Sequence, residues 1–265
     1  MKIYALCLKG YQERQEFQEK QALRYGLNLE IIPGVDGSLL SEAAIQEAAN
    51  YRSRPVTAKE LGCFLSHKKA WELVVKRQET AIIIEDDIIF SSRILDVVKE
   101  ISFRNSAAKV IYDLEYVPKN HIFAKKPKWI SSNNQMTATK IYQNKNGLGC
   151  YCLNSIAAAK LLLDCEKEVF NLADVFVWNR SWAEFLQIEP APAIQMTYMT
   201  QYDILDAQNR QTRRDVSFTN KSATKAKLIS AKKFFLGVKQ SVVGRLFGVR
   251  RKVFCNIEEF KKVQD

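Results

Sequence analysis

The sequence predicts an α/β fold with a mixed, mostly parallel central sheet, and two observations lead to this prediction. Strand-like and helix-like patterns alternate through the first half of the chain, as in folds whose parallel strands are joined by helices. Residues 81–84 form an unbroken run of apolar, mostly β-branched side chains, which is typical of a strand buried on both faces of a sheet. The second half of the chain is less regular in pattern.

The first predicted elements lie at the N-terminus. Residues 2–8 are expected to form a strand, residues 12–25 a helix that ends at Gly26, and residues 29–32 a second strand. A strand, a helix and a strand in this order predict a parallel pair with a right-handed crossover.

Further helices and strands follow along the chain. Ser41 begins a helix, and Thr57 with Glu60 matches a capping box at the start of a longer one, because hydroxyl and carboxylate can each satisfy a backbone N–H. That longer helix leads into the acidic strand. The remaining predicted elements are a helix over residues 94–101, a strand over 109–114, a strand after Gly147 and Gly149, and a helix from Asn154 or Ser155 to Leu163.

Three adjacent carboxylates, Glu85, Asp86 and Asp87, follow the buried run directly. Burying unpartnered charges is costly, so we expect them where the strand emerges, at the carboxyl end of the sheet. Open α/β sheets bind ligands at that edge, and carboxylate oxygens suit Mg²⁺ or Mn²⁺, which complete their shells with substrate phosphates. The sequence therefore predicts a metal–diphosphate site. The alternative is a solvated acidic turn or helix start without a function.

Composition limits the class of protein. An apolar fraction of 47% in 265 residues is that of a globular protein with a sizeable core. No apolar run reaches the roughly 18 to 20 residues of a membrane span, and the N-terminus lacks the features of a signal peptide. The six cysteines lie mostly in apolar surroundings and are expected to be reduced in a cytosolic protein. With only His67 and His121 in the chain, we expect no Cys/His zinc site.

The net charge of +11 is concentrated near the C-terminus, where residues 221–254 hold ten Lys or Arg and no Asp or Glu. We therefore divide the chain into a catalytic-size body, residues 1–220, and a basic segment, residues 221–265. Apolar residues recur at helical spacing over residues 225–254, which predicts a basic amphipathic helix. Such a helix suits an anionic membrane surface. The alternative is a helix docked on the body with its charges in water.

Several separated motifs together resemble glycosyltransferase family 25, the lipooligosaccharide galactosyltransferases of Gram-negative bacteria. Residues 59–87 carry the strongest likeness, because a Gly-Cys-x-x-Ser-His helix and an Ile-Glu-Asp-Asp strand occur at the expected separation. The resemblance covers about residues 3–195. The other matching pieces are Leu8 and Lys9 with Arg14, residues 35–37, Trp71, residues 149–151 and Asp174.

The resemblance implies a fold of the GT-A type and the transfer of a hexose with inversion. The implied donor is UDP-galactose, and the implied acceptor is a lipid-linked oligosaccharide of lipooligosaccharide or lipopolysaccharide. Such an enzyme would be cytoplasmic and peripheral on the inner face of the bacterial inner membrane, with residues 221–254 on the anionic surface. It would require Mn²⁺ or Mg²⁺.

The family pattern also implies roles for individual residues. Asp87 would bind the metal, and the other implied contacts to the donor are Leu8, Lys9, Arg14, Asp36, Glu85 and Asp86. Inversion needs one base to take the proton of the acceptor hydroxyl. Asp174 is the first candidate, with His67 and Asp113 after it. Asp174 could instead cap a helix, and His67 could be a hydrogen-bonded histidine packed near the core.

Two other functions stay open at this point. One is a non-catalytic basic protein that binds nucleic acid through the tail. The tail aromatics fit an apolar helix face better than a stacking platform, so we expect no nucleic-acid partner. The other is a different metal-dependent nucleotide-using transferase, and the absence of a G-x-x-x-x-G-K-[ST] sequence argues against a P-loop enzyme.

Overall fold

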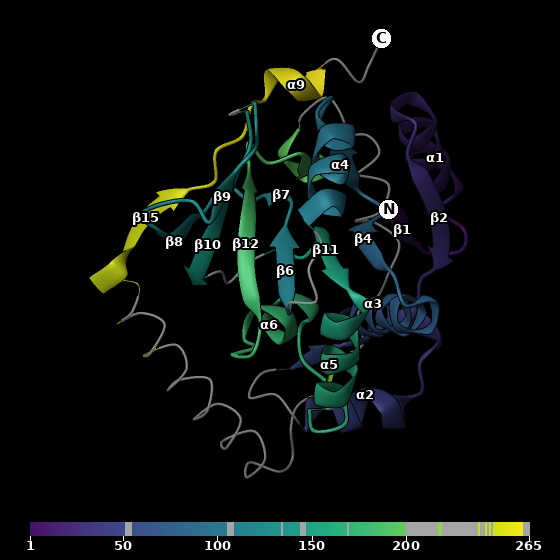
Figure 1. Cartoon of the computed structure of the whole chain (residues 1–265). Helices are drawn as coiled ribbons and strands as arrows, with labels where there is room; N and C mark the ends of the chain where they lie inside the picture. The colour runs from purple at the N-terminus through teal and green to yellow at the C-terminus, as the bar shows by residue number, and fades with distance from the viewer. Residues whose placement is uncertain are drawn as a thin grey trace.

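The computed structural model describes residues 1–50, 55–104, 109–133, 135–143, 147–168, 170–199, 217–218 and 246–261, together with residues 238, 242 and 244. Within these residues the chain forms a central sheet with helices packed on both faces (Figure 1). The predicted α/β fold with a mixed central sheet is confirmed.

The described part of the main sheet has ten strands and mixed direction. β1, β2 and β4 pair in parallel and β6 pairs in parallel with β12, whereas β11 runs antiparallel between β4 and β6. In the order in which they pair, the strands are β15 (Gly248–Lys252), β8 (Asn120–Ala124), β10 (Thr137–Gln143), β12 (Glu184–Glu189), β6 (Val110–Asp113), β11 (Cys150–Asn154), β4 (Thr80–Glu85), β1 (Lys2–Cys7) and β2 (Asn28–Pro33), with β9 (Trp129–Ile130) beside β10.

Two smaller sheets and the helices complete the described structure. The small sheets join β5 (Ile88–Phe90), β13 (Ala193–Gln195) and β7 (Glu115–Tyr116), and β14 (Ser217–Phe218) with β3 (Val56–Thr57). The helices are α1 (Gln12–Tyr25), α2 (Glu42–Ala49), α3 (Ala58–Arg77), α4 (Ile94–Arg104), α5 (Ser155–Cys165), α6 (Ala173–Trp178) and α9 (Glu258–Lys261), with short 3₁₀ turns η1 (Gly37–Leu39) and η2 (Met196–Tyr198). None of the described helices is long and apolar enough to cross a membrane.

The predicted helix ends are confirmed at several places. α1 ends at Gly26, which adopts φ +62° and donates its N–H to the last carbonyls of the helix, a conformation that glycine adopts without strain. α3 begins with the predicted capping box: the Glu60 N–H donates to Thr57 Oγ1 at 3.1 Å, and the Thr57 N–H donates to Glu60 Oε2 at 3.0 Å. Asn154 caps α5 by accepting a hydrogen bond from the Ala157 N–H.

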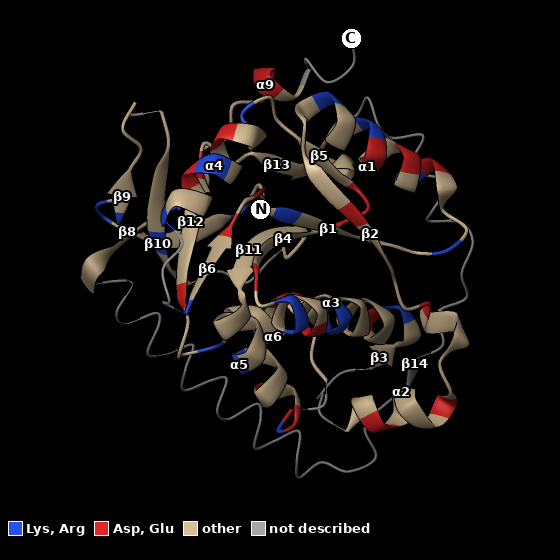
Figure 2. Ribbon diagram, turned by 45° about the vertical axis from the view of Figure 1, so that its right-hand side comes forward, with Lys and Arg blue, Asp and Glu red and all other residues tan. Residues whose placement is uncertain are grey.

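The core lies on both faces of β1 and β4, because alternate residues of a strand point to opposite sides. Tyr4 and Ile83 pack toward α2, α3, α5 and α6, whereas Ile82 and Ile84 pack toward α4. Figure 2 shows α3 with its neighbours under one face of the sheet, and α1 and α4 over the other. This double burial explains the unbroken apolar run before the carboxylates.

The C-terminal segment follows the prediction only in part. Of its described residues, 238, 242, 244, 246 and 247 are helical, as expected. Residues 248–252, expected in the amphipathic helix, form β15, which pairs antiparallel with β8. The helix prediction is wrong there because β8 offers an edge whose backbone groups another strand can satisfy. Arg251 of β15 donates to the Glu189 carboxylate of β12 at 2.6 Å. A Cβ on Gly248 would lie 2.7 Å from the Ile122 side chain, so glycine permits the close approach of β15 to β8. Residues 225–237 of the predicted helix lie outside the described residues.

Candidate functional site

Glu85, Asp86 and Asp87 lie where predicted, at the carboxyl end of β4 and in the turn that leads to β5. All three are partly exposed, whereas residues 81–84 before them are fully buried. The Glu85 N–H donates to the Gly149 carbonyl at 2.9 Å, so β11 holds the last residue of β4 in the sheet.

Two glutamines of α1 hold the acidic turn from the side, and the sequence did not indicate them. Gln18 is fully buried and donates from Nε2 to the carbonyl of Asp86 at 3.0 Å and to that of Ile88 at 2.8 Å. Gln21 donates to the Ile88 carbonyl at 2.9 Å and accepts from the Phe90 N–H at 2.8 Å. The one signal in the sequence is spacing: Arg14, Gln18 and Gln21 follow one another at four- and three-residue steps and so share one face of the helix.

Asp86 forms an ion pair with Arg14 at 2.6 Å, and a backbone N–H of Leu8 also donates to its carboxylate. Burial raises the pKa of Asp86, and the positive charge of Arg14 offsets this only in part. Arg14 is only 9% exposed, so it contacts the acidic turn from below the surface. Lys9, predicted with Leu8 and Arg14 to bind the donor, is exposed.

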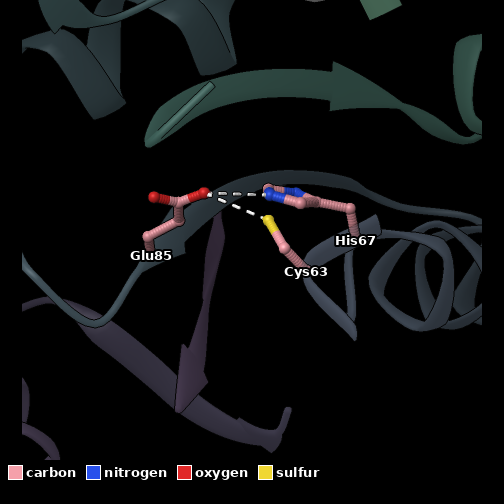
Figure 3. Close-up of side chains that lie close together, drawn as sticks. All are labelled: Cys63, His67 and Glu85. Carbon is pink, nitrogen blue, oxygen red and sulfur yellow. Dashed lines mark hydrogen bonds and ion pairs between the residues drawn. The ribbon is translucent and has the colours of Figure 1, made fainter. Parts of the chain in front are cut away.

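Glu85 accepts hydrogen bonds from three side chains. His67 Nε2 lies 3.3 Å and Cys63 Sγ 3.7 Å from Oε1, and Gln195 Nε2 lies 3.3 Å from Oε2. Figure 3 shows the first two contacts converging on one oxygen. Burial alone would raise the pKa of Glu85, but the hydrogen bond and the electrostatic interaction with His67, followed by the hydrogen bonds from Cys63 and Gln195, outweigh it and hold the pKa below its usual value.

The ring nitrogen of His67 that faces away from Glu85 also has a hydrogen-bond partner. This nitrogen, Nδ1, lies 3.0 Å from the hydroxyl of Tyr151, which accepts a hydrogen bond from the Trp71 indole at 2.8 Å. His67, Tyr151 and Trp71 are all fully buried. Cys63, His67 and Trp71 follow one another at four-residue spacing, so α3 presents them as one stripe.

Cys63, His67 and Glu85 form a group that could hold a metal ion, since one ligand atom of each lies within 4.8 Å of the others. The group has one Cys and one His and is completed by a carboxylate from the next strand, Glu85, so it leaves the expectation of no Cys/His zinc site untested. Hard ions such as Mg²⁺ and Mn²⁺ prefer oxygen ligands, which the acidic turn offers at Asp86 and Asp87. The structure thus places the Cys63, His67 and Glu85 group directly beside the acidic turn.

Glu115 is a buried carboxyl that the sequence did not single out. It is 1% exposed and accepts from the Gly149 N–H at 2.7 Å. Burial raises its pKa well above the usual value, and the charges of Asp113, Glu85 and Asp87 raise it further. Glycine is required at residue 147, because a Cβ there would lie 2.7 Å from Glu115 Oε2. The negative charges that gather here favour a cation at the acidic turn.

Asp174 lies in the first turn of α6, where its Oδ1 accepts from the Val175 N–H at 2.6 Å. It also lies within electrostatic range of the site. Desolvation raises the pKa of the Cys63 thiol well above its usual value, and the charges of Glu85, Asp174 and Asp87 raise it further. Asp174 is therefore a carboxylate at the start of α6 whose charge acts on Cys63.

The other two predicted acids have mainly local contacts. Asp113 is 4% exposed and accepts from the Glu115 N–H at 3.1 Å. Asp36 caps η1 by accepting from the Ser38 N–H at 2.9 Å. The turn packs tightly on α3, since a Cβ on Gly62 would lie 2.6 Å from the Val35 carbonyl oxygen.

Comparisons with known sequences find glycosyltransferases. A protein from Aedes aegypti named "Glycosyltransferase 25 family member" is 29% identical over 191 residues, which are 65% of this chain and 29% of that protein. Human procollagen galactosyltransferase 2 is 27% identical over 136 residues, 47% of this chain and 22% of that protein. The chain therefore spans less than a third of the length of these relatives.

Among solved structures, a glycosyltransferase involved in glycosylation of the major capsid of PBCV-1 aligns with a TM-score of 0.40 and 9% identity, over 79% of this chain and 98% of that one. The model of glycosyltransferase family 25, described as an LPS biosynthesis protein, matches residues 1–177. Because this match spans more than half of the 265 residues, the chain belongs to glycosyltransferase family 25.

Proposed function

We propose that the protein transfers galactose from UDP-galactose, with inversion, to a hydroxyl of a lipooligosaccharide or lipopolysaccharide acceptor. The main support is the acidic turn after β4 in a chain that belongs to family 25. Hydrogen bonds from α1 and to Glu85 fix this turn. The name of the human relative supports galactose, and the family description supports a lipopolysaccharide acceptor. A non-catalytic nucleic-acid-binding role has no comparable support among the described residues.

The donor side of the mechanism follows from the acidic turn. Asp87 is the proposed ligand for Mn²⁺ or Mg²⁺, because its oxygens are hard and the surrounding carboxylates favour a cation. The bound ion would neutralise the charge that develops on the departing diphosphate. Glu85 and Asp86 are proposed to face the ribose, with Leu8, Lys9, Arg14 and Asp36 along the donor. Arg14 would act chiefly by fixing Asp86.

The acceptor side needs one base. As the acceptor oxygen bonds to the anomeric carbon, the bond from that carbon to the diphosphate oxygen breaks, and the acceptor proton passes to the base. Asp174 is the proposed base, since its charge acts on Cys63, which donates to Glu85. His67 suits this role less because its two ring nitrogens already contact Tyr151 and Glu85. Asp113 suits it less because its side chain is buried.

We further propose that residues 221–254 bring the enzyme to the inner face of the bacterial inner membrane, as a cytoplasmic, peripheral protein. Ten basic residues without an acidic one support attraction to anionic lipid. β15 shows that the last part of this segment belongs to the central sheet, so the surface contact is assigned to the residues before it.

Product analysis tests the proposed transfer. The protein is incubated with Mn²⁺, a truncated lipooligosaccharide, and either UDP-galactose or UDP-glucose. We expect a product heavier by one hexose, formed faster from UDP-galactose, with an anomeric configuration opposite to that of the donor. Transfer of a nucleotidyl or phosphoryl group instead, or no turnover of either UDP-hexose, would contradict the proposal.

A further inference from the structure

A chain of hydrogen bonds runs from the core to Glu85 through residues that no mechanism step uses. Trp71 donates from Nε1 to the Tyr151 hydroxyl at 2.8 Å, this hydroxyl lies 3.0 Å from His67 Nδ1, and His67 Nε2 lies 3.3 Å from Glu85 Oε1. α3 supplies Trp71 and His67 one turn apart, and β11 supplies Tyr151 opposite Ile83 of β4. Three structural elements thus meet at one carboxylate.

The direction of each hydrogen bond can be assigned. An indole N–H only donates, so the Tyr151 oxygen accepts from Trp71 and its own proton is left for His67 Nδ1. We assign no proton to Nδ1, because the buried Tyr151 hydroxyl then has an acceptor for its own proton, and this puts the imidazole proton on Nε2, facing Glu85. The three residues behind Glu85 are fully buried, so solvent does not offer them other partners.

The same assignment separates this arrangement from a metal site on Cys63, His67 and Glu85. A metal on Nε2 requires the imidazole proton on Nδ1. Nδ1 and the Trp71 indole would then both donate to the Tyr151 oxygen, and the buried Tyr151 proton would lose His67 as its acceptor. In the observed arrangement, Cys63 and His67 therefore act as hydrogen-bond donors to the Glu85 carboxylate rather than as metal ligands.

We propose that Trp71 and Tyr151 are positioning residues, which hold the His67 proton on Nε2 so that His67, Cys63 and Gln195 orient Glu85 toward a sugar hydroxyl of the donor. This inference rests on the proposed use of a nucleotide-sugar donor. A carboxylate has about four lone-pair positions, and these three donors occupy three of them. The Glu85 side chain is 30% exposed, which leaves room for one further donor from a ligand.

Nuclear magnetic resonance can read the tautomer directly, because the chain has only two histidines. In protein labelled with ¹⁵N-histidine at pH 7.5, two-bond ¹H–¹⁵N spectra should show His67 as the Nε2–H tautomer, with a His121→Gln variant to assign the signals. Tyr151→Phe removes the hydroxyl, so the His67 signals should change to a mixture of tautomers. Trp71→Phe is the second variant, in case Tyr151→Phe does not fold.

Steady-state kinetics distinguish a positioning role of Tyr151 from a general loss of structure. Loss of orientation at Glu85 should raise the KM for the sugar nucleotide of Tyr151→Phe about 10-fold or more, while kcat changes less than about threefold. Tyr112→Phe is the matched control, because Tyr112 is another buried tyrosine beside a tryptophan, with its ring centre 6.4 Å from that of Trp129. It should leave both the His67 spectrum and the KM unchanged.

Two results would overturn the inference. One is a wild-type spectrum with the His67 proton on Nδ1, the form that a metal on Nε2 would need. The other is a folded Tyr151→Phe variant, or Trp71→Phe in its place, that keeps both the wild-type spectrum and the wild-type KM. Failure of the proposed function looks different: the wild type would show the Nε2–H tautomer and yet turn over no UDP-hexose.

Discussion

At the scale of single residues, neighbouring carboxylates acquire opposite character from their surroundings. The pKa of Glu85 is lowered because its interactions with His67, and then its hydrogen bonds from Cys63 and Gln195, outweigh its burial. The pKa of Asp86, the next residue, is raised because burial outweighs the ion pair with Arg14. Glu115 is fully surrounded, and burial with like charges raises its pKa well above the usual value. Three carboxyl groups of one site can therefore serve different purposes.

Asp174→Asn tests the proposed base. The variant keeps the size and the hydrogen-bonding capacity of the side chain but cannot take a proton, so kcat should fall at least about 100-fold, the usual contribution of a general base. Initial rates of hexose transfer at saturating donor measure this effect.

The control for this substitution is Asp96→Asn. Asp96 also lies in the first turn of a helix, α4, and therefore loses the same favourable interaction with a helix start. It should keep wild-type activity. If Asp174→Asn stays within a few-fold of the wild type, another group takes the proton.

At the scale of secondary-structure elements, the predictions succeeded where local pattern decides the outcome. The capping box of α3 and the glycine end of α1 depend on residues within a few positions of each other. β15 was predicted as a helix because Val249 and Val253 continue a three- and four-residue spacing. Its strand state depends on the edge of β8, more than a hundred residues earlier, which no local pattern contains.

The basic segment before β15 carries a separate prediction. Replacing four of its lysines by glutamine should weaken binding to vesicles rich in anionic lipid at least about 100-fold, since each basic residue near the surface contributes about 1 kcal/mol. Vesicle flotation at physiological salt measures it. The four are Lys225, Lys227, Lys232 and Lys233.

The charge-matched control replaces four exposed lysines of the body, Lys20, Lys76, Lys99 and Lys167. These substitutions lower the net charge equally and should leave vesicle binding nearly unchanged. Equal losses in both variants would show that net charge alone, rather than the basic segment, attracts the membrane.

At the scale of the whole molecule, the fold brings five separate stretches of the chain to the end of β4. They are Leu8, α1, α3, Gly149 and Gln195. The acids of the turn were predictable because a buried strand must end before adjacent charges begin. Gln195 and Tyr151 were not, since they contact Glu85 and His67 across 110 and 84 residues of sequence. The resemblance to family 25 identified Cys63 and His67 as motif members, and the structure supplies a physical reason: both donate to Glu85.

The central claim is that a divalent ion at Asp87 binds the diphosphate of a sugar nucleotide. Titration calorimetry with UDP, with and without Mn²⁺, on wild type and on Asp87→Asn tests it most directly. We predict that Mn²⁺ tightens UDP binding to the wild type by at least about tenfold, or 1.4 kcal/mol, and leaves the weak binding of Asp87→Asn unchanged. An Asp87→Asn protein that binds UDP as tightly as the wild type in Mn²⁺, or a wild type indifferent to Mn²⁺, would contradict the account.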